Sequence, residues 1–181
     1  MRLPRAVVVA AVAAIACPPG ADAQRPGSLE IGAYGQVTSV SSEQARFETT
    51  TPLSLGIRGR VNLHRRIGVE LEASTGVVDG AGDPPRRRYN QLVARGTYTV
   101  PVSEFSGLLL GAGVARSDYE LTYNFGADVL LGVQTVIRSR YALRSDVIFN
   151  YLPASGAHEL AIRSGLQVVL GPFDGPTSRD R

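Results

Sequence analysis

The sequence has one cysteine, Cys17, and neither lysine nor tryptophan among its 181 residues. A single cysteine cannot form a disulfide within one chain, so the fold must be stable without such cross-links. Beyond the N-terminal segment, no run approaches the 18 consecutive apolar residues that a transmembrane helix needs, which excludes a helical membrane protein.

All 19 basic residues are arginines, opposed by 16 acidic residues, for a net charge of +3. Nucleic-acid binding requires basic residues gathered on one face. Here most arginines alternate with apolar residues, and the only basic runs, Arg65-Arg66 and Arg86-Arg87-Arg88, fall in predicted turns. We therefore expect no nucleic-acid partner.

The N-terminus has the pattern of a secretory signal peptide. Arg2 and Arg5 precede the apolar run Val7 to Ala16, and Ala21-Asp22-Ala23 fits a small-residue cleavage site. We expect residues 1–23 to be removed after Ala23. The alternative is a lipoprotein signal that uses Cys17, although such signals usually place a leucine where this chain has alanine.

After residue 28, apolar and polar residues alternate in stretches of about ten, as in half-buried strands. In residues 53–63, for example, every second residue is apolar except Gly59, and Arg58, Arg60 and Asn62 lie between them. The pattern predicts eight strands, at about residues 29–40, 53–63, 67–76, 89–100, 105–116, 121–136, 141–151 and 159–170.

The connections between these strands alternate in length. The first and third, residues 41–52 and 77–88, are long, whereas the second, fourth and sixth have three or four residues. Bacterial membrane barrels have short periplasmic turns and longer outer loops. We therefore predict an all-β fold: an eight-stranded antiparallel up-and-down transmembrane β-barrel over residues 24–171, followed by a short polar tail, 172–181.

Two observations indicate that the apolar face points outward, toward lipid. In a soluble barrel, the apolar face would instead point into the interior. Aromatic residues lie mostly near strand ends, as in interfacial girdles; they are Tyr89, Tyr98, Phe105, Tyr123, Phe125, Tyr141, Phe149 and Tyr151. The other face is charged, and we assign it to a lumen network of Arg58, Arg60, Glu70, Glu72, Arg95, Asp128, Arg144, Asp146 and Arg163.

A hairpin turn centred on Arg65 places Arg60 opposite Glu70 and Arg58 opposite Glu72. Such cross-strand pairs contribute about 0.2–1 kcal/mol each. Eight strands enclose a lumen just wide enough for side chains, so we expect a plugged barrel. The alternative is that these pairs serve only to set the strand register.

The segment from Phe125 to Val133 and the strand from Ala142 to Tyr151 resemble the late hairpin of small outer-membrane β-barrel proteins of the OmpA/OmpX kind. The resemblance covers about residues 28–171. It implies an outer-membrane location, a polar, side-chain-filled barrel and no agreed activity. Those proteins commonly end on a phenylalanine that signals assembly by the barrel machinery; here the last strand is followed by Phe173 and a polar tail.

The sequence gives little support for a catalytic site or a metal site. Lipid A-modifying barrels use a His and a Ser at the rim, but His64 lies in a short turn, and Ser155, His158 and Glu159 share one short loop. No residue cluster has metal-ligand spacing, and we expect no cofactor. Arg86, Arg87 and Arg88 at the outer rim are a candidate contact for lipopolysaccharide phosphates.

We therefore expect a monomeric outer-membrane barrel with a structural or surface-interaction role, in contact with outer-membrane lipids, and no enzymatic activity. The alternatives are a small gated channel or transport accessory, a lipid A-modifying rim enzyme, and a soluble periplasmic ligand-binding barrel.

Overall fold

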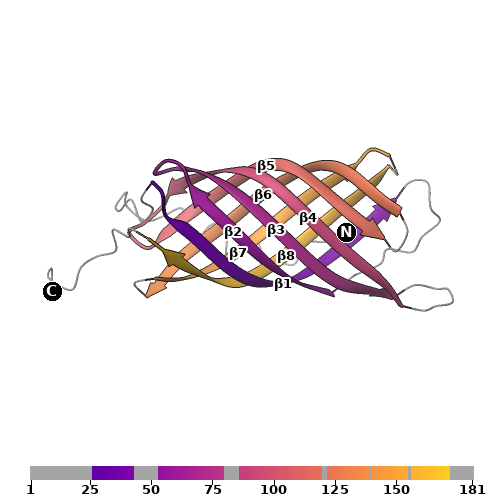
Figure 1. The fold of residues 1–181 in the computed structure, drawn as a ribbon, viewed down its shortest axis with the longest axis horizontal. Helices are drawn as coiled ribbons and strands as arrows, with labels where there is room; N and C mark the ends of the chain where they lie inside the picture. Colours follow the sequence, from indigo (N-terminus) through magenta and orange to yellow (C-terminus); the bar gives the residue numbers. More distant parts are fainter. Residues whose placement is uncertain are drawn as a thin grey trace, which may run out of the picture.

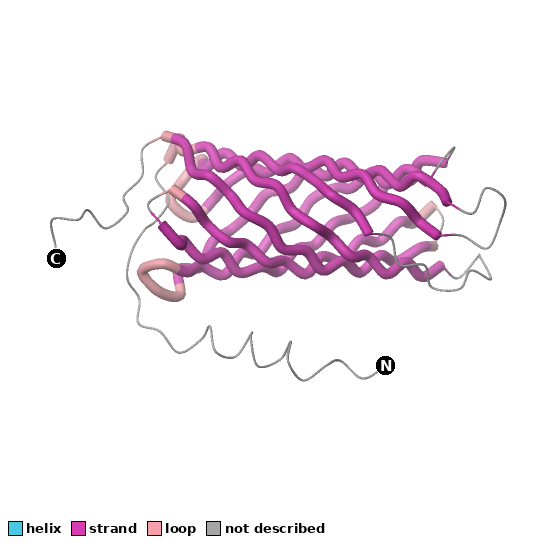
Figure 2. Tube along the Cα trace, turned by 90° about the horizontal axis from the view of Figure 1, so that it is seen from below, coloured by secondary structure: helices cyan, strands magenta, loops and turns pink. Residues whose placement is uncertain are grey.

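The computed structural model describes residues 26–42, 53–79, 86–119, 122–138, 140–154 and 156–171. They form a closed barrel of antiparallel strands in chain order, in which β8 pairs with β1 (Figures 1 and 2). The strands are β1 (Leu29–Ser42), β2 (Leu53–Asn62), β3 (Ile67–Asp79), β4 (Arg86–Pro101), β5 (Ser106–Tyr119), β6 (Thr122–Arg138), β7 (Tyr141–Leu152) and β8 (Ala157–Leu170). The predicted eight-stranded barrel is confirmed, and residues 1–23 and 172–181 lie outside the described residues.

Several strands run further than the sequence pattern indicates. β3 extends to Asp79 and β4 begins at Arg86, so the predicted connection 77–88 shortens to residues 80–85. Asp79 stands opposite Arg86 in this hairpin, and Arg86 to Arg88 belong to a strand instead of a loop. Alternation of apolar residues ends before the strand does, because backbone pairing alone still satisfies the N–H and C=O groups. The loop asymmetry is therefore weaker than predicted.

The two faces of the barrel wall differ sharply. Outward positions carry large apolar side chains, such as Leu55, Ile57 and Val114, with 71%, 65% and 60% of their surface exposed. Inward positions bury charged side chains, including Arg144 and Glu70 at 0% exposure. This arrangement is the reverse of a soluble barrel, whose apolar side chains fill the interior. Among the described residues, no helix is long and apolar enough to span a membrane.

Part of the lumen is apolar. Leu109 on β5 points inward and packs with Leu130, Ile148 and Ala161 on the three following strands. Leu110 points outward with 41% exposure, so the three consecutive leucines at residues 108–110 follow ordinary strand alternation. These four apolar side chains from β5 to β8 thus form a small patch on the wall of a lumen that the sequence predicted to be polar throughout.

Tyr89 departs from the predicted aromatic girdle. Its side chain faces the lumen with 0% exposure. The aromatic residues that do lie on the outer surface include Tyr98, Phe105 and Tyr141 at one end and Phe125, Phe149 and Tyr151 at the other.

A glycine on β5 lets an arginine lie flat against the wall. A Cβ at Gly113 would overlap the carbonyl oxygen of Ala94 and approach Arg95 Cα to 2.6 Å, whereas a Cβ at Gly96, on the outer face, meets nothing within 4 Å. We expect Gly113→Ala to lower the free energy of unfolding by about 1–3 kcal/mol through overpacking, and Gly96→Ala to leave it nearly unchanged. Urea titration of the folded barrel in detergent micelles measures both; equal stabilities would contradict the packing described.

Candidate functional site

Ten charged side chains are buried in the lumen, in the middle of the barrel and toward the end where β1 begins. The hairpin β2–β3 supplies two arginines and two glutamates, because charged residues occupy alternate positions on both strands. The other strands that contribute are β1, β4, β6, β7 and β8. The set comprises five arginines, Arg58, Arg60, Arg95, Arg144 and Arg163, and five carboxylates, Glu30, Glu70, Glu72, Asp128 and Asp146, each at most 4% exposed. The charges therefore balance within this set.

Six of these side chains form a closed ring of alternating charge, which we call the charge ring. Asp146 lies 2.8 Å from Arg144 and 3.1 Å from Arg163. Arg163 pairs with Glu72, and Arg144 pairs with Glu70. Arg95 closes the ring, because it contacts Glu72 directly and Glu70 at 3.6 Å.

The charge ring joins opposite walls of the barrel. Its two glutamates lie on β3, whereas Arg144 and Asp146 lie on β7, four strands away in either direction around the closed sheet. Every ring side chain has 0% exposure. At this level, protein side chains span the lumen from wall to wall.

Further charges branch from the ring. Arg58 donates to Asp146 at 2.6 Å, and Asp128 lies 3.1 Å from Arg95. Closer to the end where β1 begins and β8 ends, Arg60 stands 3.7 Å from Glu30 and donates a hydrogen bond to Thr99 Oγ1 at 2.8 Å. Removal of any one of these side chains would leave its partner as an uncompensated buried charge. The stabilities that the members contribute are therefore interdependent.

The register places Arg58 opposite Glu72 and Arg60 opposite Glu70. The ion pairs of these arginines are different: Arg58 pairs across the lumen with Asp146 on β7, whereas Arg60 pairs with Glu30, which stands opposite it on the other neighbouring strand, β1. In a narrow barrel, a long arginine side chain such as that of Arg58 can reach a carboxylate on another wall. The nine lumen residues singled out from the sequence all face inward. Some of them pair with the residue opposite on a neighbouring strand, as Arg163 does with Asp146, whereas others pair across the lumen, as Arg144 does with Glu70.

Tyr34 on β1 belongs to the same network and escaped sequence analysis. Its ring lies between two guanidinium groups, with Arg58 Cζ 4.7 Å and Arg163 Cζ 4.8 Å from the ring centroid. In such contacts the guanidinium cation is attracted to the face of the aromatic ring. Gly56 and Gly165 stand opposite Tyr34 on the two flanking strands, and a Cβ on either would overlap its side chain. An inward tyrosine flanked by glycines in register is the signal that could have revealed it.

A second polar cluster lies nearer the other end of the lumen and is centred on Glu159. Its Oε2 accepts hydrogen bonds from Gln91 and Asn150, each at 3.0 Å, and from Ser117 at 3.2 Å and Tyr89 at 3.3 Å. These side chains come from β4, β5, β7 and β8. Sequence analysis missed the cluster because its neutral members carry no charge pattern.

The described residues separate the histidine from the glutamate of the Ser–His–Glu arrangement considered for a rim enzyme. His158 and Glu159 are consecutive on β8 and point to opposite faces: Glu159 is buried in the lumen, whereas His158 stacks on Tyr151 at 5.0 Å on the outer side. Ser155 lies outside the described residues, and His64 is exposed in a turn. No group of three or more His, Cys, Asp or Glu within the described ranges could hold a metal ion.

The arginine run at the rim is only partly described. Arg88 is exposed on β4, while the side chains of Arg86 and Arg87 lie outside the described residues.

No protein-family model matches the sequence, and no curated protein does so. The fold is that of small outer-membrane β-barrels of known structure. Neisserial surface protein A aligns with a TM-score of 0.67 at 15% identity, over 78% of this chain and 98% of that one. OprG of Pseudomonas aeruginosa has a TM-score of 0.60 at 14% identity (84% and 100% covered), and Ail of Yersinia pestis has 0.57 at 14% (80% and 99%).

Asp146 contacts three arginines and is the most connected carboxylate of the network. We expect Asp146→Asn to cost about 3–5 kcal/mol of unfolding free energy, the cost of breaking a buried pair. The matched control is Asp118→Asn, which breaks the half-exposed Arg116–Asp118 pair and should cost less than about 1 kcal/mol. Similar losses for both variants in urea titrations would refute a tightly coupled network.

Proposed function

We propose that this chain is an outer-membrane β-barrel with a closed lumen, whose role is structural or lies in contacts made by its outer surface. The charge ring carries this proposal, because it fills the lumen with paired side chains that bridge opposite walls. An open porin instead keeps a water-filled interior, which requires many more strands.

The outer surface supports a position in a lipid bilayer. Exposed leucine, isoleucine and valine side chains surround the barrel, and a closed barrel leaves no unpaired strand edge in the hydrocarbon. The strands have 10–17 residues, and all except β2 exceed the 9–11 needed to cross a bilayer. The barrel therefore extends beyond the hydrocarbon layer.

The orientation follows from the termini. Leu29 at the start of β1 pairs with Leu170 at the end of β8, so both chain ends leave the barrel at the same end. In an exported barrel with an even strand number, this is the periplasmic end. The opposite end, with the connections at residues 43–52, 80–85, 120–121 and 153–156, then faces the outside, and we call it the outer end.

Cell fractionation tests the location. We expect the folded protein in the outer-membrane fraction, with a gel mobility that changes on boiling because the closed sheet resists detergent until heated. A soluble periplasmic protein whose mobility is independent of boiling would contradict the membrane assignment.

Electrical recording tests the closed lumen. We expect no steady conductance from the wild-type barrel in planar bilayers, because the ring side chains obstruct the lumen. The double variant Glu70→Ala with Arg144→Ala removes one carboxylate and one arginine, keeps the net charge, and should raise ion leakage. Arg116→Ala with Asp118→Ala, a pair on the outer wall, is the control and should stay silent.

Steady, discrete conductance by the wild-type protein would overturn the closed barrel and favour the gated channel. Boiling-dependent mobility of each variant shows that the barrel has folded before its conductance is compared.

A further inference from the structure

The seam between β1 and β8 is the joint that closes the barrel. Its residue pairs run from Leu29 opposite Leu170 to Ser42 opposite Ala157. These partners are further apart in the sequence than those of any other strand pair. Contacts between distant residues carry the largest loop-closure entropy, so the seam is the last joint to form and the first place where the sheet can open.

The charge ring does not fasten β1 directly. Its six members lie on β3, β4, β7 and β8, and they hold these four strands together across the lumen. The first strand therefore depends on its own inward side chains. Two of them, Glu30 and Tyr34, contact residues that lie beyond the seam.

Glu30 joins β1 to β6. Its side chain is fully buried, and its Oε2 accepts a hydrogen bond from Gln134 Nε2 at 3.0 Å, while its Oε1 accepts one from Asn62 Nδ2 at 2.8 Å. Asn62 lies on β2, the hairpin partner of β1, whereas Gln134 reaches Glu30 only across the lumen of the closed sheet. Hydrogen bonds to a charged acceptor are among the stronger ones. The bond from Gln134 therefore opposes any movement of β1 away from the barrel.

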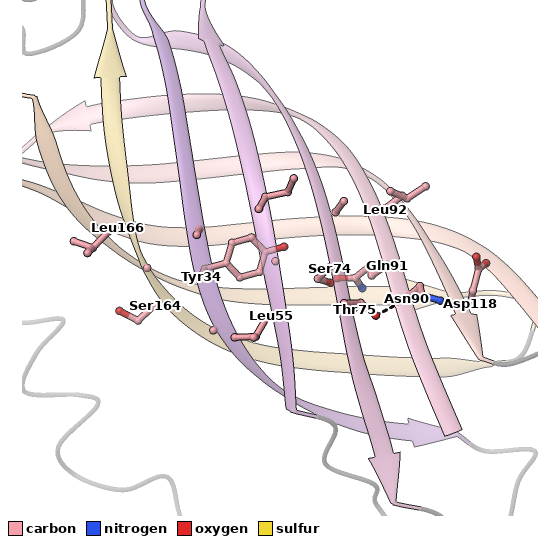
Figure 3. Close-up of a pocket in the computed structure, with 16 residues that line it drawn as sticks. Tyr34, Leu55, Ser74, Thr75, Asn90, Gln91, Leu92, Asp118, Ser164 and Leu166 are labelled. Atoms are coloured by element: carbon pink, nitrogen blue, oxygen red, sulfur yellow. Dashed lines mark hydrogen bonds between the residues drawn. The ribbon is translucent and has the colours of Figure 1, made fainter. Parts of the chain in front are cut away.

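Tyr34 joins β1 to β8. Its ring extends over β2, where Gly56 leaves room for it (Figure 3). Arg58 of β2 lies 4.7 Å from the ring centroid and Arg163 of β8 lies 4.8 Å from it, measured from each Cζ. If β1 moved away from β8, the ring would lose its contact with Arg163 and keep the one with Arg58.

We propose that Glu30 and Tyr34 form a lock that keeps the β1–β8 seam closed, and that β1 separates from β8 in the first step of unfolding. Each lock residue contacts the neighbouring strand β2 and also a strand beyond the seam. The contacts with β2 persist in an opened sheet, whereas those with Gln134 and Arg163 exist only in the closed barrel. The inference concerns how the barrel opens, so it goes beyond the proposed function and holds whatever the outer surface contacts.

A disulfide across the seam tests the lock, because it holds β1 against β8 without the two side chains. Gly35 and Ser164 are exposed and opposite each other. Opposite residues have Cα atoms about 4.5–5.5 Å apart, within the range that a disulfide spans, so Gly35→Cys with Ser164→Cys bridges the seam. Thr75→Cys with Asn90→Cys is the matched control, an exposed opposite pair between β3 and β4 (Figure 3). Both proteins carry Cys17→Ser, which removes the third thiol.

The lock variants are Gln134→Leu and Tyr34→Leu, each placed in both cysteine proteins. Unfolding rates in urea are measured in detergent micelles from the loss of the gel band that changes on boiling, with the disulfide formed and with it reduced. In the reduced proteins, we expect each lock variant to raise the unfolding rate about tenfold, a factor that corresponds to about 1.4 kcal/mol. With the seam disulfide formed, the increase should fall below about twofold, whereas with the control disulfide it should stay near tenfold.

An equal increase in the oxidised and reduced seam proteins would overturn the proposal, because the two side chains would then stabilise the barrel independently of the seam. Equal protection by the control disulfide would also overturn it, as would unchanged unfolding rates in the reduced proteins. A lock variant that folds only when the seam disulfide is formed supports the proposal, and one that folds in neither state contradicts it.

Discussion

Buried ion pairs across the lumen are the constraint on which the rest of this barrel depends. An arginine or carboxylate withdrawn from water costs several kcal/mol unless partners surround it. In the charge ring each arginine meets two carboxylates and each carboxylate meets at least two arginines, with Tyr34 packed between two guanidinium groups. The ring tolerates burial because no member is left to a single partner.

The wall is shaped to hold that ring. Gly113 and Gly111 of β5 make space for Arg95, Gly132 lies against Asp146, and Gly56 lies beneath Tyr34. Inward glycines thus let long side chains lie along the sheet within an eight-stranded lumen. On the outer surface, the small residues Ala33, Gly35 and Ala73 line a groove beside β2.

The alternation of residues 53–63 with charged partners was enough to predict the strands, the inward face and the register of Arg58 with Glu72. The cross-lumen contacts, such as Arg144 with Glu70, could not be predicted, because they depend on barrel closure and on side-chain reach instead of on strand neighbours. Tyr89 and the Glu159 cluster were missed for a related reason. A tyrosine near a strand end is assigned to the aromatic girdle unless it is known whether its side chain points to the lumen or to lipid. The strand ends at Asp79 and Arg86 were missed because apolar alternation stops before backbone pairing does.

A double-mutant cycle on Glu70 tests the central claim most directly. Glu70→Gln is combined with Arg144→Gln on the opposite wall and, separately, with Arg60→Gln on the neighbouring strand, and unfolding free energies give the two coupling energies. We predict that Glu70 couples to Arg144 by about 1–3 kcal/mol, within the range of residues in direct contact, and more weakly to Arg60. A larger coupling to Arg60, or none to Arg144, would show that the charges pair along the wall and do not bridge the lumen.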